Sequence, residues 1–297
     1  MKRKKGLIAI IAVIVMIALV FGGYNIYRYP AMFQSLKDNS LTDSYEYKRQ
    51  ELYAEHNGNR IYGVIYIPQN AGTQMPAVIF SHGFGGNYQV GTQYAEDLAA
   101  RGYVVYCFDF CGGSPRSKSD GSALEMSIFT EQADLEAVMN MMCRLDYVDE
   151  NNLFLMGTSQ GGAVSAITAA ANPDKVQGAV LLYPAFVLVD SAKELFASVD
   201  EIPESYYHMW MTVGKTYFEN LLDYDIYEAI SDYEKDILLI HGDEDNIVPL
   251  AYSERAVKAY SFATLEIIPG AGHGFHGRQA DQAIEYIVQY LKAHVER

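Results

Sequence analysis

Basic residues are scarce in this sequence. It contains 22 Lys and Arg against 37 Asp and Glu, and four of the basic residues are gathered at positions 2–5. Proteins that bind nucleic acid neutralise phosphates with clustered Lys and Arg. No such cluster follows Lys5, so the charge balance argues against a nucleic acid as a partner.

Cysteine is also rare, and its odd count excludes a complete disulfide framework. The three residues are Cys107, Cys111 and Cys143. In extended chain, at about 3.3 Å per residue, the first two lie beyond the roughly 7 Å that a disulfide can bridge. We therefore expect buried or half-buried thiols. Neither His nor Cys shows a cluster with metal-ligand spacing, so no metal site is predicted.

One long apolar run is present, over residues 6–23, directly after the basic cluster. A spanning helix needs roughly 20 apolar residues, whereas a cleavable signal peptide has an apolar segment of about 7–15. The run therefore predicts a single-pass N-terminal anchor over residues 1–23. Cleavage after Gly22, which would give a secreted protein, is the alternative. The positive-inside rule keeps the basic cluster cytoplasmic and predicts that the domain after this run is extracytoplasmic.

Beyond a polar stalk predicted over residues 24–44, β-rich runs alternate with segments of helical periodicity. This alternation is typical of a mostly parallel sheet covered by helices on both faces. A hairpin at one sheet edge brings the predicted strand count to eight. The predicted strands are residues 46–54, 60–68, 77–80, 103–110, 152–156, 176–183, 237–240 and 264–268. The predicted helices are residues 94–100, 129–142, 162–171, 253–260 and 284–291.

About fifty residues separate the sixth predicted strand from the seventh, far more than one crossover helix needs. We interpret residues 185–235 as a cap on one domain that spans residues 45–297. The cap is rich in aromatic residues, which suits the wall of a pocket. Tyr206, Tyr207 and Trp210 are predicted to bind substrate, and packing of the cap onto the body is the alternative for each.

The sharpest motif is Gly-Thr-Ser-Gln-Gly-Gly at residues 157–162, which directly follows a predicted strand and precedes a helix of small residues. In this context the motif predicts a nucleophile elbow, in which a strained turn presents the Ser159 hydroxyl above the sheet. Glycines two positions to either side leave room for the turn. Ser159 is therefore the predicted nucleophile.

A serine hydroxyl needs a base, and the base needs a carboxylate that orients it. His273 lies in a glycine-rich loop after the last predicted strand, nearer the strand end than its rival His276. Asp245 follows the strand at 237–240, with Asp243 as the rival in the same loop. The chain order Ser159, Asp245, His273 is the order expected for a hydrolase of this topology.

An oxyanion hole needs two backbone N–H donors. One is predicted at Gln160, directly after the nucleophile, and the other at Phe84, in the glycine-rich loop at residues 82–87. His82 begins this loop. We expect it to have a structural role, with its ring bonded to nearby loop backbone.

These motifs give the sequence its family resemblance. It resembles the α/β-hydrolase superfamily, and within it the bacterial cinnamoyl (feruloyl) esterases and the relatives of dienelactone hydrolases. The resemblance implies that the nucleophile, acid, base and oxyanion donors fall at the positions named above, with a cap between strands 6 and 7. The residues that carry it are 82–86, Asp109 with 112–114, 157–162, 241–242 with Asp245 and 248–249, and 272–273.

The predicted function is that of a serine carboxylic ester hydrolase that acts through an acyl-enzyme on small-molecule esters, without metal or organic cofactor. Aromatic residues in the cap favour short or aromatic acyl groups. A serine exopeptidase or acyltransferase with the same triad is the first alternative, because the scaffold does not fix the leaving group or the acceptor. In a peptidase, Glu201 or Glu204 could hold a substrate amine. A binding protein without catalysis is the second alternative.

Overall fold

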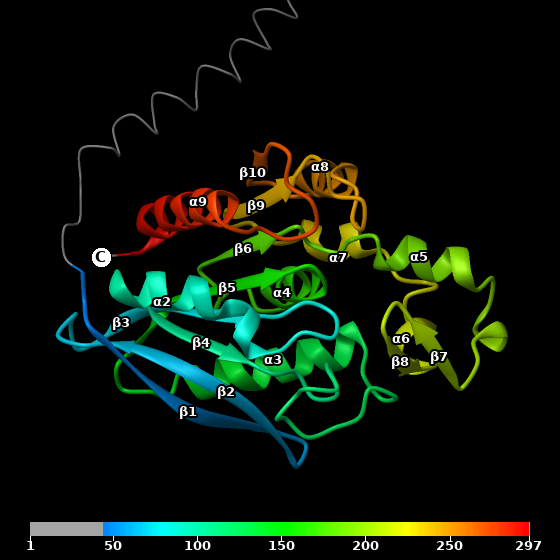
Figure 1. The fold of residues 1–297 in the computed structure, drawn as a ribbon, viewed down its shortest axis with the longest axis horizontal. Helices are drawn as coiled ribbons and strands as arrows, with labels where there is room; N and C mark the ends of the chain where they lie inside the picture. Colours follow the sequence, from blue (N-terminus) through cyan, green and yellow to red (C-terminus); the bar gives the residue numbers. More distant parts are fainter. Residues whose placement is uncertain (1–43, 297) are drawn as a thin grey trace, which may run out of the picture. The chain divides into compact units, whose positions relative to one another are not determined.

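The computed structural model describes residues 44–296. Within this part of the chain an eight-stranded sheet forms the centre, in the order β1-β2-β4-β3-β5-β6-β9-β10 (Figure 1). β2 runs antiparallel to both its neighbours, and all other neighbouring pairs are parallel. The prediction of a mostly parallel eight-stranded sheet is confirmed. The strands are β1 (Tyr47–His56), β2 (Asn59–Pro68), β3 (Met75–Ser81), β4 (Val104–Phe108), β5 (Val148–Thr158), β6 (Gly178–Leu182), β9 (Ile237–Gly242) and β10 (Ala263–Ile268).

Membrane anchorage is the expectation that the structure corrects. No helix between residues 44 and 296 is long and apolar enough to cross a bilayer. The longest of these helices, α9 (Arg278–His294), carries charged residues along its length. A single-pass membrane protein is therefore not supported, and the predicted cell-membrane location is withdrawn. The run at residues 6–23 that prompted the prediction, and the stalk except for Ser44, lie outside the described residues.

The hairpin of β1 and β2 turns at Asn57 and Gly58. Both residues have positive φ, 50° and 83°, which is the conformation of the two-residue turns whose twist matches that of paired strands. Asn and Gly tolerate this region better than other residues do. The predicted edge hairpin is therefore confirmed, and its turn follows from the local sequence.

Helices cover both faces of the sheet, and each face has its own apolar core. In β5, Leu155 belongs to one core, while its neighbours Phe154 and Met156 belong to the other. Successive side chains of a strand point to opposite faces, so a strand covered on both faces reads as a continuous apolar run. The helices α2 (Thr92–Ala100) and α9 contribute to one core; α3 (Ile128–Met142), α4 (Gln160–Ala171), α7 (Ile226–Ser231) and α8 (Ala251–Ala259) contribute to the other.

The interval between β6 and β9 contains a small hairpin of its own. Its strands, β7 (Ser205–His208) and β8 (Met211–Gly214), form a separate antiparallel pair. Figure 1 shows this hairpin beyond the end of the sheet towards which β4, β5 and β6 point. The cap therefore lies over the carboxyl ends of the parallel strands, where α/β proteins place their sites. Its other elements before α7 are α5 (Leu188–Leu195), η2 (Val199–Glu201) and α6 (Thr216–Glu219).

Stability should depend on the two cores and not on isolated apolar residues at the surface. Leu239 in β9 is fully buried, whereas Leu124 is 50% exposed. We expect Leu239→Ala to lower the free energy of unfolding by about 2–5 kcal/mol, because the cavity in a packed core closes only in part. The matched control Leu124→Ala should stay within about 0.5 kcal/mol of the parent. Urea unfolding followed by circular dichroism measures both, and equal losses would contradict this account of the core.

Candidate active site

Ser159 lies on the turn between the end of β5 and the start of α4. Its backbone adopts φ 51° and ψ −120°, a region that residues other than glycine rarely occupy. The N–H of Ser159 donates to the carbonyl of Leu182 at 2.9 Å, and its own carbonyl accepts from the N–H of Ala185 at 2.9 Å. The neighbouring strand and the start of the cap thus hold the turn in place.

Two glycines make this turn possible. A Cβ atom at Gly157 would overlap the carbonyl oxygen of Gly161, and a Cβ at Gly161 would overlap the carbonyl oxygens of Ser81 and His82. The turn therefore packs directly against the end of β3 with no side chain between them. This contact explains why the motif has glycine two residues before and two residues after Ser159.

Three loops at the carboxyl edge of the sheet bring Ser159, His273 and Asp245 into one hydrogen-bonded chain. His273 Nε2 lies 2.9 Å from Ser159 Oγ, and His273 Nδ1 lies 2.7 Å from Asp245 Oδ2. The Asp245 side chain is fully buried and that of His273 is 15% exposed. In this arrangement the imidazole can accept the serine proton while the carboxylate fixes its tautomer.

Asp245 is held as a carboxylate by four donors. Its Oδ1 accepts the N–H groups of Ile247 and Val248, both at 2.9 Å. Its Oδ2 lies 3.2 Å from His241 Nε2, in addition to its contact with His273. Burial raises the pKa of Asp245, but the hydrogen bonds from the two imidazoles and the two N–H groups outweigh burial and hold this pKa well below its usual range. The group therefore stays charged opposite the imidazole of His273.

Neither of the rival residues, Asp243 and His276, belongs to this hydrogen-bonded chain of side chains. Asp243 is exposed, and its Oδ1 accepts the N–H of Gly270 at 2.6 Å. That bond fixes the approach of the loop after β10. His276 is exposed and is not hydrogen-bonded to Ser159 or Asp245 within residues 44–296. The geometry thus favours the residues that the sequence placed first.

The two predicted oxyanion donors adjoin Ser159. Gln160 is the first residue of α4 and is 1% exposed. Phe84 follows Gly83, where an added Cβ would lie 3.0 Å from Ser159 Cβ. Gln160 thus follows Ser159 in the chain, and Phe84 follows a glycine that packs against Ser159. Their role in catalysis stays a prediction.

His82 has the structural role expected of it. Its ring is buried, Nδ1 lies 2.8 Å from the carbonyl oxygen of Gly83, and the N–H of Phe110 donates to Nε2 at 3.2 Å. Because Nε2 accepts, the proton is on Nδ1 and the ring is neutral. Burial lowers the pKa of His82 accordingly. The ring joins the loop after β3 to the loop after β4.

The three cap residues predicted to bind substrate have different surroundings. The rings of Trp210 and Phe84 lie 5.6 Å apart between centroids, and Trp210 is 53% exposed. Tyr206 packs inside the cap against Phe196 at 5.5 Å, as in the alternative that the sequence left open. Tyr207 is 68% exposed. Of the three, Trp210 is placed beside a predicted oxyanion residue.

Two tyrosines at the site were not among the residues predicted to bind substrate. Tyr183, directly after β6, has φ 38°, and its ring centroid lies 4.9 Å from that of His273. Tyr217 in α6 donates its hydroxyl hydrogen bond to Gln160 Oε1 at 2.7 Å. The position of Tyr183 at a strand end was a signal that could have been used. No local spacing distinguished Tyr217 from the other aromatic residues of the cap.

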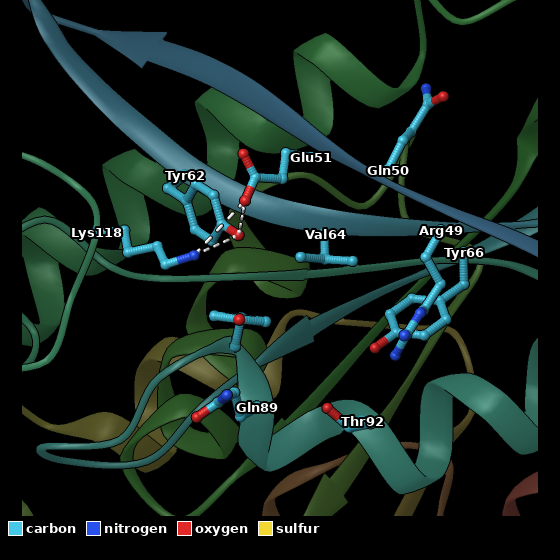
Figure 2. A pocket seen from close by; sticks show the side chains of 10 residues that line it. Arg49, Gln50, Glu51, Tyr62, Val64, Tyr66, Gln89, Thr92 and Lys118 are labelled. Carbon is cyan, nitrogen blue, oxygen red and sulfur yellow. Dashed lines mark hydrogen bonds and ion pairs between the residues drawn. The ribbon is translucent and has the colours of Figure 1, made fainter.

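A polar groove of about 490 Å³ lies apart from this site, between β1, β2 and the start of α2 (Figure 2). Within it Lys118 Nζ donates to the Tyr62 hydroxyl at 2.9 Å, and that hydroxyl donates to Glu51 at 2.8 Å. These polar groups are paired with one another, and no residue of the hydrogen-bonded Ser–His–Asp chain lines the groove. Its lining residues are Arg49, Gln50, Glu51, Tyr62, Val64, Tyr66, Tyr88, Gln89, Thr92 and Lys118.

A nucleophile elbow on a mostly parallel sheet, followed in chain order by an acid and a histidine, defines a serine hydrolase of the α/β-hydrolase fold. The resemblance read from the motifs is confirmed at this level. The prolyl oligopeptidase family matches residues 89–297, more than two thirds of the chain. The protein therefore belongs to the prolyl oligopeptidase family.

The chain is also similar to individual proteins. The chain is 28% identical over 229 residues to the Mycobacterium tuberculosis protein Rv2307c. The alignment covers 76% of this chain and 72% of that protein. Est1E from Butyrivibrio proteoclasticus, solved with ferulic acid bound, has a TM-score of 0.74 at 24% identity over 82% of this chain and 99% of its own. Acetyl xylan esterase 1 from Thermoanaerobacterium sp. JW/SL YS485 has a TM-score of 0.62 at 20% identity, over 87% of this chain and 92% of its own. These structural likenesses show the fold.

The two carboxylates of the loop after β9 can be told apart by substitution. Asp245→Asn removes the charge opposite His273 and should lower kcat on an ester by about 10⁴, the order seen for the triad acid of serine proteases. Asp243→Asn removes only a loop contact to the Gly270 N–H and should keep most activity. Steady-state kinetics on one ester, with circular dichroism to confirm folding, gives the ranking. The reverse ranking would show that the acid is misassigned.

Proposed function

We propose that the protein hydrolyses carboxylic esters through an acyl-enzyme formed on Ser159. The observation that carries this proposal is the hydrogen-bonded chain from Ser159 Oγ through His273 to the buried Asp245, with distances of 2.9 Å and 2.7 Å. A serine hydroxyl paired with a base that a third group orients is the arrangement of an activated nucleophile.

The reaction proceeds in two steps. Ser159 Oγ attacks the ester carbonyl while its proton passes to His273 Nε2, and the negative charge on the substrate oxygen is held by the N–H groups of Phe84 and Gln160. The ester C–O bond then breaks, and His273 returns the proton to the leaving alcohol. Water, deprotonated by the same imidazole, attacks the acyl carbon. The bond from this carbon to Ser159 Oγ then breaks, His273 returns the proton to Ser159 Oγ, and the acid leaves. Asp245 stabilises the imidazolium in both steps.

For the acyl group we propose a preference for short or aromatic chains. The rings of Trp210 and Tyr217 lie 5.6 Å and 5.5 Å from that of Phe84, so aromatic surface adjoins the predicted oxyanion donor. Flat acyl groups pack well against such surfaces. Est1E, solved with ferulic acid bound, shares this fold and supports the choice of a hydroxycinnamoyl ester as one test substrate.

Peptide hydrolysis is the second candidate, and it is favoured by membership of the prolyl oligopeptidase family. The acidic residues that could bind a substrate amine, Glu201 and Glu204, are both exposed. Glu201 Oε2 accepts the N–H of Ala197 at 2.9 Å, so it serves the cap's own backbone. Neither residue belongs to the aromatic surface around Phe84, and ester hydrolysis is therefore the better supported of the two.

Kinetics on a small substrate panel tests these statements. We expect higher kcat/KM for p-nitrophenyl butyrate and methyl ferulate than for aminoacyl p-nitroanilides, since Glu201 and Glu204 do not belong to the aromatic surface around Phe84. Emulsified long-chain triglycerides should be turned over more slowly than either ester. Anilide hydrolysis faster than ester hydrolysis would make the protein a peptidase, and faster turnover of the triglycerides would overturn the acyl preference.

The cap residues give a more local test. Trp210→Ala should lower kcat/KM on methyl ferulate about tenfold, because an aromatic pair contributes about 0.5–1.5 kcal/mol beyond its buried area. Its effect on p-nitrophenyl acetate, which has no ring in its acyl group, should be less than about twofold. Tyr207→Ala, in the same hairpin but 68% exposed, should change neither value. A larger effect of Tyr207→Ala would reverse our assignment of the pocket wall.

A further inference from the structure

Tyr217 contacts both residues whose N–H groups are proposed to hold the oxyanion. It belongs to the cap helix α6 and is 2% exposed. Its hydroxyl donates to Gln160 Oε1 at 2.7 Å, and its ring lies 5.5 Å from that of Phe84. One buried cap side chain therefore joins the donor at the start of α4 to the donor in the loop after β3.

The side-chain amide of Gln160 is fixed at its other end by a buried carboxyl group. Gln160 Nε2 donates to Glu131 Oε2 at 2.8 Å and lies 3.7 Å from Met126 Sδ. Glu131 is in the first turn of α3 and is 1% exposed. Tyr217 donates to the amide oxygen and Glu131 accepts from the amide nitrogen, so both ends of the amide are hydrogen-bonded to buried side chains.

We propose that Glu131 and Tyr217 are positioning residues of the oxyanion hole, which they hold in place through the side chain of Gln160 and the ring of Phe84. The proposal rests on the ester hydrolysis proposed above. It assigns the cap a part in the chemical step in addition to substrate binding. Donors that are already in place when charge develops need no reorganisation, and loss of one donor typically costs about 10²–10³ in kcat. Partial loss of its support should cost less.

The ionisation state of Glu131 matters for this role. Burial and the nearby Asp134 raise the pKa of Glu131, whereas the hydrogen bond from Gln160 lowers it in part. Together these effects bring the pKa to about 8. At neutral pH the carboxyl group is therefore protonated. Above that pKa a negative charge forms behind Gln160, where it opposes the negative charge of the transition state.

The other ionisable groups around Glu131 are already paired or neutral. Asp134 accepts the N–H of Cys111 at 2.8 Å and lies 3.4 Å from His56 Nδ1. Burial raises the pKa of Tyr217 well above its usual value, so its hydroxyl stays protonated. As the pH rises through 8, Glu131 gains a negative charge behind Gln160, and kcat should fall.

The first variant is Tyr217→Phe, which keeps the ring against Phe84 and removes the hydrogen bond to Gln160. We expect kcat on p-nitrophenyl butyrate to fall about tenfold with KM within about twofold, since the loss is confined to the transition state. Binding of a phenylboronic acid, whose adduct with Ser159 places an oxygen in the oxyanion hole, should weaken by a similar factor. A purely structural role for Tyr217 would lower the melting temperature and leave both values unchanged.

The second variant is Glu131→Gln, which keeps an acceptor for Gln160 but cannot ionise. Its kcat at pH 7 should lie within about twofold of the parent value, and the fall in kcat above pH 8 should disappear. Glu125→Gln, an exposed carboxyl six residues earlier, is the matched control and should keep the fall. If Tyr217→Phe does not fold, the pH profiles of Glu131→Gln and Glu125→Gln still test the positioning role.

The outcomes separate the two proposals. If the parent enzyme hydrolyses esters but Tyr217→Phe has unchanged kcat and Glu131→Gln keeps the alkaline fall, the positioning role is overturned and the proposed function stands. If the parent neither hydrolyses esters nor reacts with a fluorophosphonate, the proposed function fails, and the positioning role falls with it.

Discussion

The backbone of Ser159 lies at φ 51°, a conformation that costs a non-glycine residue about 1–3 kcal/mol. Such a turn persists only where its surroundings hold it, and here the strand order supplies them. β5 lies between β3 and β6, so the end of β3 packs on Gly161 while Leu182 at the end of β6 accepts the Ser159 N–H. The elbow therefore depends on long-range strand pairing as much as on its own glycines.

Two buried carboxyl groups, Asp245 beside His273 and Glu131 beside Gln160, have opposite electrostatic states. Asp245 is surrounded by donors, including His241, and keeps its charge near the imidazole that becomes positive in the proposed mechanism. Glu131 has the amide of Gln160 as its donor and, because it is buried, keeps its proton near the place where negative charge develops. A carboxylate stabilises a positive charge that develops beside it and destabilises a negative one.

Sequence patterns predicted those parts of the fold and site that are determined by residues close together in the sequence. Alternating periodicity gave the sheet, Asn57 and Gly58 gave the edge hairpin, and the glycine spacing at residues 157–162 identified the elbow. The contacts of Gln160 could not be predicted in this way, because Glu131 lies 29 residues before it and Tyr217 lies 57 residues after it. The hairpin in the cap was missed because its strands have four residues each, too few for a periodic pattern. The membrane prediction rested on residues 6–23, and no helix of the described residues supports it.

The proposed mechanism requires Ser159 to carry the acyl group between the two steps. Mass spectrometry of the protein quenched in acid during turnover of p-nitrophenyl acetate tests it directly, because the quench preserves an ester on serine. We predict one acetyl group per chain on the peptide that contains Ser159, and none in Ser159→Ala, which should also lose turnover. Turnover at the parent rate by Ser159→Ala, or an acetyl group that accumulates on another residue at the rate of catalysis, would contradict the account.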